Sequence, residues 1–399
     1  MKTWWTSSHL EETTKYFLHL EASTRCNAGC PFCGRYERSS LQVQRELVQT
    51  DLTVQKLEQW LGPKVLSKLD EVVFCGNFGD PSMNPHLIDI IEHIGSYSTN
   101  ILLKINTNGG ARNETFWSDL AKTVSKFERD PSLTFSIDGL EDTNHIYRRN
   151  VKWSNLIRNV KAFINAGGKA EWDYLVFKHN EHQIDDAIKL AKELGIHRLN
   201  IKSPTGLDDH GLKQRHDRPV YDKEGNLEYY IKQADRYVNE NYKLIKLNEF
   251  GEKIILNRTF YDPENSSVNL DKHKYLDEYK IDCPVAKHKH RKGLYLTADG
   301  HFFPCCWLGY YSQIPFTSDV SNDFYNRIGG HYGCNLNDSS METIFEIWDK
   351  AFLNSWDSKV EEGKCLACAS TCGVKVIENI RQASVLTETG EEISKFDIK

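Results

Sequence analysis

The feature that most constrains the fold is a regular alternation of strand-like and helix-like segments over residues 17–203. Short runs rich in branched and aromatic residues alternate with stretches whose apolar residues recur with a helical period. Such alternation is typical of right-handed βαβ units, whose strands form one parallel sheet. The predicted strands are Phe17–Ala22, Glu71–Cys75, Ile101–Asn106, Leu133–Ile137, Tyr174–Phe177 and His197–Lys202.

Helical patterns fill the intervals between these strands. The clearest has an apolar stripe from Ile184 to Leu194, and Gly195 directly after it is a suitable C-terminal cap. Six such units predict an α/β fold, either an incomplete barrel or an open doubly wound sheet. In both folds, functional side chains collect beyond the carboxyl ends of the strands. The other predicted helices lie within residues 53–70, 87–94, 116–124 and 156–164.

Length and composition exclude several classes of protein. The 399 residues suffice for two domains and a large core, and the net charge of −6 argues against a nucleic-acid-binding protein, which is usually basic. The first ten residues lack the apolar stretch of a signal peptide, and no run approaches the ~18 apolar residues of a membrane span. We therefore expect a cytoplasmic protein without membrane contact.

The eleven cysteines are unevenly distributed. Three lie close together near the start, Cys75 stands alone, and seven lie between Cys283 and Cys372. An odd number of cysteines without an export signal does not indicate a disulfide framework. Short spacings in two separate groups instead predict metal or iron–sulfur ligation at two places.

The first group, Cys26, Cys30 and Cys33, has the spacing Cys-x3-Cys-x2-Cys and follows the first predicted strand. Three thiolates on one loop can bind three irons of a [4Fe–4S] cubane and leave the fourth iron open. Electron-transfer clusters usually have four cysteine ligands, so this spacing indicates chemistry at the open iron. The alternative is a zinc site that uses one more ligand, such as His19.

This motif after the first strand of six βα units resembles the radical S-adenosylmethionine (radical SAM) superfamily. The resemblance implies a partial (βα)6 TIM-like barrel and a cluster that reductively cleaves S-adenosylmethionine (SAM) at its open iron. The resulting 5′-deoxyadenosyl radical takes a hydrogen atom from the substrate, while the protein positions and shields the cofactor. In the family an aromatic residue often precedes the last cysteine and lies near the adenine; here it is Phe32.

Two further strand ends resemble SAM-contacting segments of the family. After the second strand, Cys75–Pro81 is similar to a glycine-rich segment that commonly ends Gly-Glu-Pro, with Asp80 in place of the glutamate. After the third strand, Asn108 occupies a polar position that is followed by glycine. Simple glycine turns are the alternative explanation for both segments.

The fourth strand ends in the Ser136–Gly139 stretch, Ser-Ile-Asp-Gly, with Arg148 downstream. This arrangement resembles peptide-modifying radical SAM enzymes, in which the serine and the arginine approach the ribose or the carboxylate of SAM. A guanidinium fork suits a carboxylate, although Arg149 could take the place of its neighbour. The resemblance therefore implies SAM contacts from Phe32, Gly76, Asn77, Gly79, Asp80, Asn108, Ser136, Asp138 and Arg148.

The second cysteine group resembles the SPASM or twitch extensions of radical SAM enzymes, which hold two auxiliary [4Fe–4S] clusters or one. Its seven members are too few for two complete clusters, so the resemblance implies one, as in twitch extensions. The Cys-x2-Cys pair is the usual ligand pair, which leaves the last cysteine doubtful. The implied ligands are Cys283 and Cys305, with two of Cys365, Cys368 and Cys372.

Three alternatives stay open for these cysteines. Cys306 and Cys334 could serve a second auxiliary cluster with an open iron. They could also be buried free thiols, as could Cys75. A zinc site at Cys365 and Cys368 is the third alternative.

The chain divides into predicted regions on this basis. Secondary structure expected beyond the core comprises a helix at 227–242, a hairpin of 294–297 with 301–303, and a helix at 341–356. The regions are a radical SAM core (1–204), a connector (205–282), an auxiliary Fe–S domain (283–385) and a tail (386–399).

The resemblance favours an enzyme that modifies a peptide or a protein by epimerisation, cross-linking or oxidation. A dehydrogenase or epimerase of small, sugar-derived molecules is the second hypothesis, and a non-catalytic zinc or Fe–S binding protein is the third. Only sixteen residues precede the first predicted strand, too few for the leader-peptide recognition domain that many peptide-modifying enzymes carry there. A flavodoxin or ferredoxin is the expected reductant.

Other polar residues near the expected mouth of the barrel have no assigned role. Glu171, Asp173 and His179 are candidates for a catalytic acid or base, and the sequence prefers none of them. The basic run at 287–292 is either solvated or binds an acidic substrate. Further candidate contacts are Lys178, Asn180, Lys202 and Ser203.

Overall fold

The computed structural model describes most of the chain between Trp4 and Lys375. Several predicted features lie outside the described residues: Ser203, the second half of the helix expected at 227–242, most of the basic run and the tail. The described residues are 4–8, 12–37, 40–202, 204, 217–234, 243–247, 253–257, 274–283, 285, 291–313, 319–330 and 333–375.

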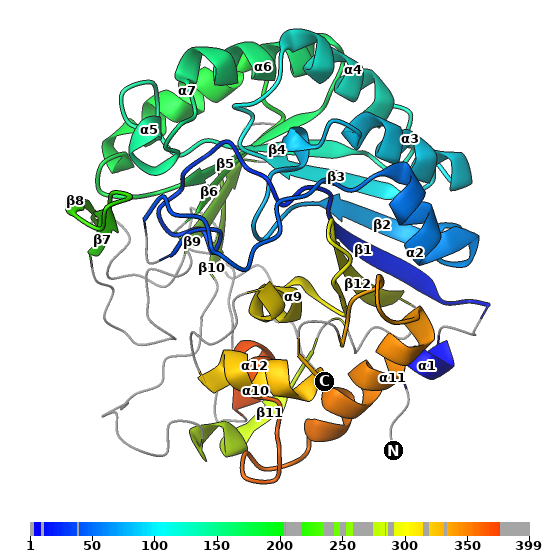
Figure 1. The fold of residues 1–399 in the computed structure, drawn as a ribbon. Coiled ribbons are helices and arrows are strands. Elements are labelled where there is room, and N and C mark those ends of the chain that lie inside the picture. Colours follow the sequence, from blue (N-terminus) through cyan, green and yellow to red (C-terminus); the bar gives the residue numbers. More distant parts are fainter. Residues whose placement is uncertain are drawn as a thin grey trace, which may run out of the picture.

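A mostly parallel sheet forms the centre of the described structure (Figure 1). Six of its strands follow one another in chain order and are parallel, so the predicted α/β fold of six βα units is confirmed. The full strand order is β10-β9-β6-β5-β4-β3-β2-β1-β12-β13. The six strands are β1 (Lys15–Glu21), β2 (Leu69–Phe74), β3 (Leu102–Thr107), β4 (Ser132–Ser136), β5 (Ala170–Leu175) and β6 (Arg198–Lys202).

The fifth strand differs most from its predicted position. β5 covers Ala170–Leu175, whereas the pattern predicts Tyr174–Phe177. Acidic side chains at alternate positions interrupt the apolar residues of this strand, so it contains no continuous apolar run. The buried residues on that side are Ala170, Trp172 and Tyr174.

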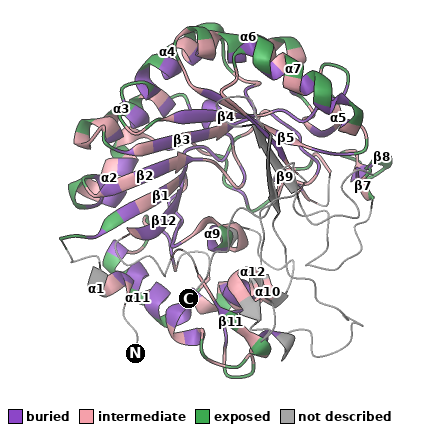
Figure 2. Cartoon of the chain, turned by 180° about the vertical axis from the view of Figure 1, so that it is seen from behind, coloured by how far each residue is buried: buried purple, intermediate pink, exposed green. Residues whose placement is uncertain are grey.

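Helices cover one face of the sheet and bury their apolar stripes against it (Figures 1 and 2). Thr53 caps the first of them by accepting the N–H of Lys56, and Gly195 ends the last in the left-handed conformation, as predicted. None of the described helices is long and apolar enough to cross a lipid bilayer. They are α2 (Val54–Leu66), α3 (Leu87–Tyr97), α4 (Glu114–Val124), α6 (Trp153–Asn165) and α7 (Ile184–Leu194), with the short α5 (Asn144–Tyr147).

The connector contains a hairpin where a helix was expected at 227–242, so that prediction is wrong for its described part. β7 (Arg218–Tyr221) and β8 (Leu227–Ile231) pair in antiparallel fashion. Asp222 accepts the backbone N–H of Asn226 at 2.7 Å, which closes the turn between them. The turn reverses the chain just before the predicted helix start, and the following residues pair as a strand.

Both edges of the central sheet are formed by chain that follows the six βα units. β12 (Arg291–Thr297) lies parallel to β1, and β13 (Phe302–Phe303) pairs with β12 in antiparallel fashion, which confirms the predicted hairpin. At the other edge, β9 (Lys243–Leu247) and β10 (Lys253–Asn257) form an antiparallel pair beside β6. The hairpin therefore joins the C-terminal part of the chain directly to the core.

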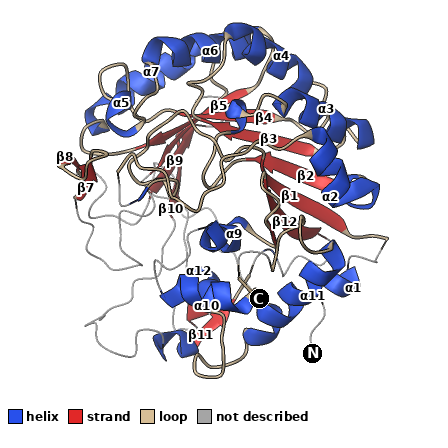
Figure 3. Cartoon of the chain, in the orientation of Figure 1, coloured by secondary structure: helices blue, strands red, loops and turns tan. Residues whose placement is uncertain are grey.

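The described residues from 274 to 375 form what we call the C-terminal unit. Its helices gather on the side of the sheet opposite α2–α7 (Figure 3). The helix predicted at 341–356 ends earlier, at Ala351, and a 3-10 turn follows at Leu353–Ser355. The helices are α9 (Cys306–Gln313), α10 (Asp319–Arg327), α11 (Met341–Ala351) and α12 (Leu366–Cys372), and β11 (Tyr279–Ile281) pairs with β14 (Gly373–Lys375).

A short N-terminal helix, α1 (Trp5–Ser8), is held on this unit by Asp349 of α11. The buried carboxylate accepts the backbone N–H groups of Trp4, Trp5 and Thr6 at 2.9, 3.1 and 3.3 Å. The hydroxyl of Thr6 donates to it as well, at 2.7 Å. One side chain of α11 thus satisfies the exposed donors at the start of α1.

Replacing Asp349 by Ala should release residues 4–8 from the C-terminal unit. Because hydrogen bonds to a charged group contribute about 1.5–3 kcal/mol, we expect the free energy of unfolding to fall by about 2 kcal/mol. Denaturant unfolding and hydrogen exchange of these amides measure the effect. The exposed Asp338 offers a matched control, since Asp338→Ala should change neither quantity. Unchanged protection of residues 4–8 in the Asp349→Ala protein would contradict the anchoring role.

Candidate active site

The loop after β1 carries the first group of cysteines. Cys30 is buried, Cys26 and Cys33 are partly exposed, and all three are free thiols. A tight turn joins two of them, because the N–H of Cys33 donates to the carbonyl of Cys30 at 3.1 Å. Arg35, which is 3% exposed, fixes the end of the loop by donating to the carbonyl oxygen of Phe78 at 3.1 Å. The loop lies at the carboxyl end of β1, where six βα units predict a site.

Two thiols of this loop contact residues that follow the next two strands. The Cys33 sulfur lies 3.9 Å from the carbonyl oxygen of Asn77, which comes after β2. The side-chain amide of Asn108, which comes after β3, donates to the Cys26 sulfur at 3.7 Å. Two of the predicted SAM-contact segments therefore reach the cysteine loop.

The third thiol contacts the segment beyond β4. Arg148 Nη1 lies 3.5 Å from the sulfur of Cys30, and its Nε donates to the fully buried Asp138 carboxylate at 2.6 Å. Arg149 points elsewhere and pairs with Glu228 of β8 at 2.6 Å. Of the two arginines, Arg148 is therefore the one beside the cysteine loop, and each of the three thiols meets a residue from a different strand end.

Burial and charge act in opposite directions on these groups. Burial raises the pKa of all three thiols, that of Cys33 to about 11, and the Asp80 carboxylate raises the pKa of Cys26 further. At Cys30, the Arg148 guanidinium opposes the effect of burial on the pKa. Thiolates grouped in this way repel one another, so they need a cationic centre among them, and bound iron supplies one.

The donor set suits a cubane better than a single zinc ion. Within the described residues, no three His, Cys, Asp or Glu side chains converge closely enough to hold one metal ion. Zinc needs its ligands at about 2.0–2.3 Å from one point, whereas each cysteine of a cubane binds a separate iron. His19, the alternative zinc ligand, has its Nε2 2.6 Å from the carbonyl oxygen of Cys75.

The Asp80 carboxylate is buried and saturated with hydrogen bonds. It accepts the N–H and the hydroxyl of Ser82, the hydroxyl of Thr107, and the backbone N–H and amide of Asn108, at 2.6–2.9 Å. A carboxylate has about four lone-pair sites, and five donors already surround this one. The side chain therefore joins the ends of β2 and β3, and the SAM contact that the resemblance implies for Asp80 stays a prediction.

Close backbone packing explains the glycines of the same segment. A Cβ on Gly79 would lie 1.7 Å from the carbonyl oxygen of Ser23, and a Cβ on Gly76 would lie 2.5 Å from that of Gly79. The N–H groups of Phe78 and Gly79 both donate to the carboxylate of Glu21 at 2.8 Å. The segment thus wraps around a buried glutamate at the end of β1.

The side chain of Asn77 turns toward the C-terminal unit. Its Nδ2 donates to the carbonyl oxygen of Cys306 at 2.8 Å and to the hydroxyl of Tyr295 at 3.0 Å. Tyr295 in turn donates to Glu21 at 2.5 Å. The resemblance implies a SAM contact for Asn77, which stays a prediction, and the side chain joins the glycine-rich segment to the C-terminal unit.

Phe32 and Ser136 lie half-buried at the site. The Phe32 ring centroid is 5.9 Å from that of Tyr147, and the Arg218 guanidinium of β7 lies 5.6 Å from the Phe32 ring. The connector hairpin therefore reaches the cysteine loop. Ser136 ends β4, directly opposite Asp173 of β5 in the sheet register.

The three candidate acids and bases are engaged elsewhere. Glu171 and Asp173 form ion pairs with residues of β6, at 3.4 and 2.5 Å. The His179 ring stacks on Phe177 with centroids 5.2 Å apart, and burial lowers its pKa to about 4. None of these contacts involves the cysteine loop, so the structure singles out no catalytic acid or base.

The sequence profile of the Radical SAM superfamily matches residues 20–217. The matched range contains the cysteine loop and the three strand ends that meet its thiols. The chain belongs to the radical SAM superfamily. It is a radical SAM enzyme, and membership of the family implies a [4Fe–4S] cluster and SAM as cofactors. The hypothesis of a non-catalytic binding protein is thereby disfavoured.

A search of solved structures found matches to this radical SAM enzyme at low sequence identity. SuiB from Streptococcus suis bound to S-adenosylmethionine is 15% identical, with a TM-score of 0.44 over 76% of this chain and 63% of SuiB. SuiB bound to the precursor peptide SuiA is 14% identical, with a TM-score of 0.47 over 91% of this chain and 72% of SuiB. Native anSMEcpe with bound AdoMet is 15% identical, with a TM-score of 0.45 over 83% of this chain and 80% of anSMEcpe. Thus the chain spans less than two thirds of SuiB in the first comparison, and none of the curated proteins searched matches it.

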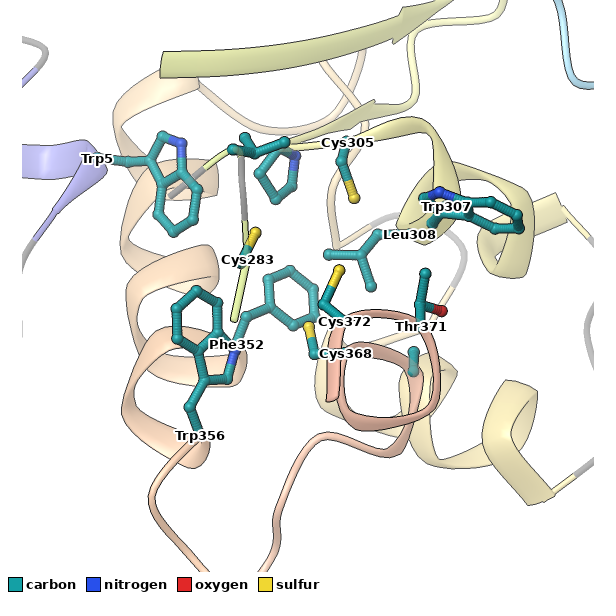
Figure 4. A pocket seen from close by; sticks show the side chains of 13 residues that line it. Trp5, Cys283, Cys305, Trp307, Leu308, Phe352, Trp356, Cys368, Thr371 and Cys372 are labelled. Atoms are coloured by element: carbon teal, nitrogen blue, oxygen red, sulfur yellow. The ribbon is translucent and has the colours of Figure 1, made fainter. Parts of the chain in front are cut away.

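A second cysteine site of the radical SAM enzyme lies in the C-terminal unit. Cys283, Cys305, Cys368 and Cys372 line one largely apolar cavity and point toward its centre (Figure 4). Cys283 follows β11, Cys305 precedes α9, and the other two lie on α12, where Cys372 shares a thiol hydrogen bond with Cys283. The aromatic part of the lining consists of Trp5, Trp307, Phe352 and Trp356.

The other late cysteines do not line the described cavity. Cys365 is fully buried just before α12, and its thiol shares a hydrogen bond with the thiol of Cys368. Cys334 is buried against Trp348, and Cys306 lies beside Asn77. Of the three cysteines Cys365, Cys368 and Cys372, the last two thus line the described cavity, while the ligands and the number of auxiliary clusters stay predictions.

Two residues that hold the site together, Glu21 and Tyr295, are not among the residues predicted from the sequence. Glu21 ends an apolar strand with a charge, which is a usable signal for a buried functional or structural carboxylate. Tyr295 carries no such signal, because its contact with Glu21 depends on the pairing of β12 with β1. In the basic run, Arg291 pairs with Glu71 at 2.8 Å, and Lys292 lies over the ring of Trp4.

The buried Glu21 predicts a stability that depends on pH. Burial raises its pKa from 4.5 to about 7, so between these values the folded state keeps a proton that the unfolded state has released. Stability should therefore fall by roughly 3 kcal/mol as pH rises through this window. Glu21→Gln keeps an acceptor for the Phe78 and Gly79 amides and cannot ionise. We expect it to match the parent near pH 4 and to exceed its free energy of unfolding by that amount at pH 8. A difference that does not change with pH would refute the assignment.

Proposed function

We propose that Cys26, Cys30 and Cys33 bind the [4Fe–4S] cluster of this enzyme and leave its fourth iron open to SAM. When bound, the two cofactors supply the 5′-deoxyadenosyl radical that takes a hydrogen atom from the substrate. The observation that carries the proposal is the contact of each thiol with a residue from a different strand end.

The surrounding residues have the chemistry that SAM requires. Arg148 is a fixed, charged donor beside Cys30 and suits the carboxylate of SAM. Phe32 offers an apolar ring for the adenine, and Ser136 offers a hydroxyl at the end of β4. Asn108 and the backbone of the Gly76–Asp80 segment frame the opposite side of the loop.

The substrate that we propose is a peptide or a protein, modified by epimerisation, cross-linking or oxidation. The Ser136–Gly139 stretch resembles that of peptide-modifying radical SAM enzymes, and Asp138 within it positions Arg148 beside Cys30. The test substrate is a deuterated peptide whose gene lies next to the gene of this chain. Deuterium from this peptide should appear in 5′-deoxyadenosine. Transfer only from a deuterated sugar-derived alcohol would favour the small-molecule hypothesis instead.

We assign one auxiliary [4Fe–4S] cluster to the cavity of the C-terminal unit, with Cys283, Cys305, Cys368 and Cys372 as ligands. Four thiols that face one cavity suit a cluster without an open iron. Such a cluster transfers electrons and does not ligate the substrate. A flavodoxin or ferredoxin is the proposed reductant, and the division into a core (1–204) and an auxiliary domain (283–385) is part of the same proposal.

Replacing Cys26, Cys30 and Cys33 by Ala should abolish SAM cleavage, because no protein ligand then holds the first cluster. Anaerobically reconstituted protein with a strong reductant is assayed for 5′-deoxyadenosine. Cys334→Ala is the matched control, since this buried thiol lies against Trp348 and away from both sites, and it should leave cleavage unchanged. Cleavage by the triple variant at the parent rate would disprove the assignment.

A comparison of Cys372→Ser with Cys365→Ser distinguishes between the two alternative ligand sets of the auxiliary cluster. Both are made in the triple-alanine protein, which should itself retain about four irons and four sulfides per chain, all in the C-terminal unit. We expect Cys372→Ser to lose or alter this cluster in Mössbauer spectra and Cys365→Ser to retain it. The reverse result would restore the usual Cys-x2-Cys pair as ligands.

A further inference from the structure

Asn77 lies between the two sets of cysteines. Its carbonyl oxygen is 3.9 Å from the sulfur of Cys33 in the first set. Its Nδ2 donates at 2.8 Å to the carbonyl oxygen of Cys306, which is covalently joined to Cys305 in the lining of the cavity. A single residue therefore connects the cysteine loop of the core with the cysteine cavity of the C-terminal unit.

The amide of Asn77 has no donor left for SAM. A primary amide carries two N–H donors, and here they meet Cys306 at 2.8 Å and Tyr295 at 3.0 Å. Donation to a cofactor would break one of these bonds. The side chain is thus committed to the C-terminal unit, while its carbonyl stays beside Cys33.

Neighbouring contacts hold Asn77 in this orientation. Phe78 stacks on Tyr310 of α9, with ring centroids 5.7 Å apart and planes within 5°. The N–H of Phe78 binds Glu21, and the same carboxylate accepts the Tyr295 hydroxyl. Contacts on both sides of the Asn77 amide therefore hold the glycine-rich segment against the C-terminal unit.

We infer that Asn77 is the electronic link between the two cluster sites, an inference that rests on the proposed function. The route from Cys33 to Cys305 follows covalent bonds of Asn77 and of the Cys305–Cys306 peptide, with non-covalent steps of 3.9 and 2.8 Å. Electrons tunnel more readily through bonds and short hydrogen bonds than across a gap. In each exchange, one cluster is oxidised by one electron and the other is reduced by it, so no proton and no outside oxidant is needed.

Asn77→Ala tests this link, because it removes the bond to Cys306 and leaves the backbone carbonyl beside Cys33. The reconstituted full-length enzyme is reduced by a flash with a photoexcited deazaflavin. Freeze-quench EPR then follows the electron as it equilibrates between the two clusters. We expect equilibration to slow severalfold in Asn77→Ala, while iron and sulfide contents stay at the parent level.

Tyr295→Phe is the matched control. It removes the other partner of the same amide and a hydrogen bond to Glu21, but it keeps the bond to Cys306. The parent rate is expected for this variant. Equal slowing by both variants, or no slowing by Asn77→Ala, would overturn the inference. A parent protein with only one cluster would overturn the inference and the auxiliary-cluster assignment together, while leaving the core cluster standing.

Discussion

The structure depends on the placement of three thiols, one buried and two partly buried, at one edge of a parallel sheet. Parallel strands present all their carboxyl ends at the same edge, so residues far apart in the chain can surround one loop. Asn77, Asn108 and Arg148 follow three successive strands, and each contacts one thiol. Burial makes it costly to ionise these thiols without a cationic partner, which is why the loop is suited to iron and poorly suited to remain a free thiol cluster.

A buried carboxylate connects this edge to the rest of the chain. Glu21 accepts two amides from the glycine-rich segment and a hydroxyl from Tyr295, so it joins β1, the segment after β2, and β12. Asn77 completes the joint through Cys306. The radical SAM site and the C-terminal unit are therefore built around shared polar contacts rather than connected only by the chain.

Local patterns in the sequence predicted those elements of the fold that short-range interactions determine. Strand and helix periods identified the six βα units, and Gly195 ended its helix as expected, because caps and apolar stripes are short-range features. The convergence of Asn108 and Arg148 on the cysteines also followed from topology. The helix expected at 227–242 is wrong for its described part because the turn at Asp222 leads into a strand there. That Cys372 lines the cavity and Cys365 does not depends on long-range packing that spacing does not encode.

The central claim is that SAM binds the one iron of the core cluster that no cysteine of the loop ligates. Electron–nuclear double resonance of the reduced protein with isotope-labelled SAM tests it most directly. We expect a hyperfine coupling between the core cluster and the amino nitrogen of SAM, and a changed EPR signal when SAM is added. A cluster signal that ignores SAM, with no coupling to the labelled nitrogen, would contradict it.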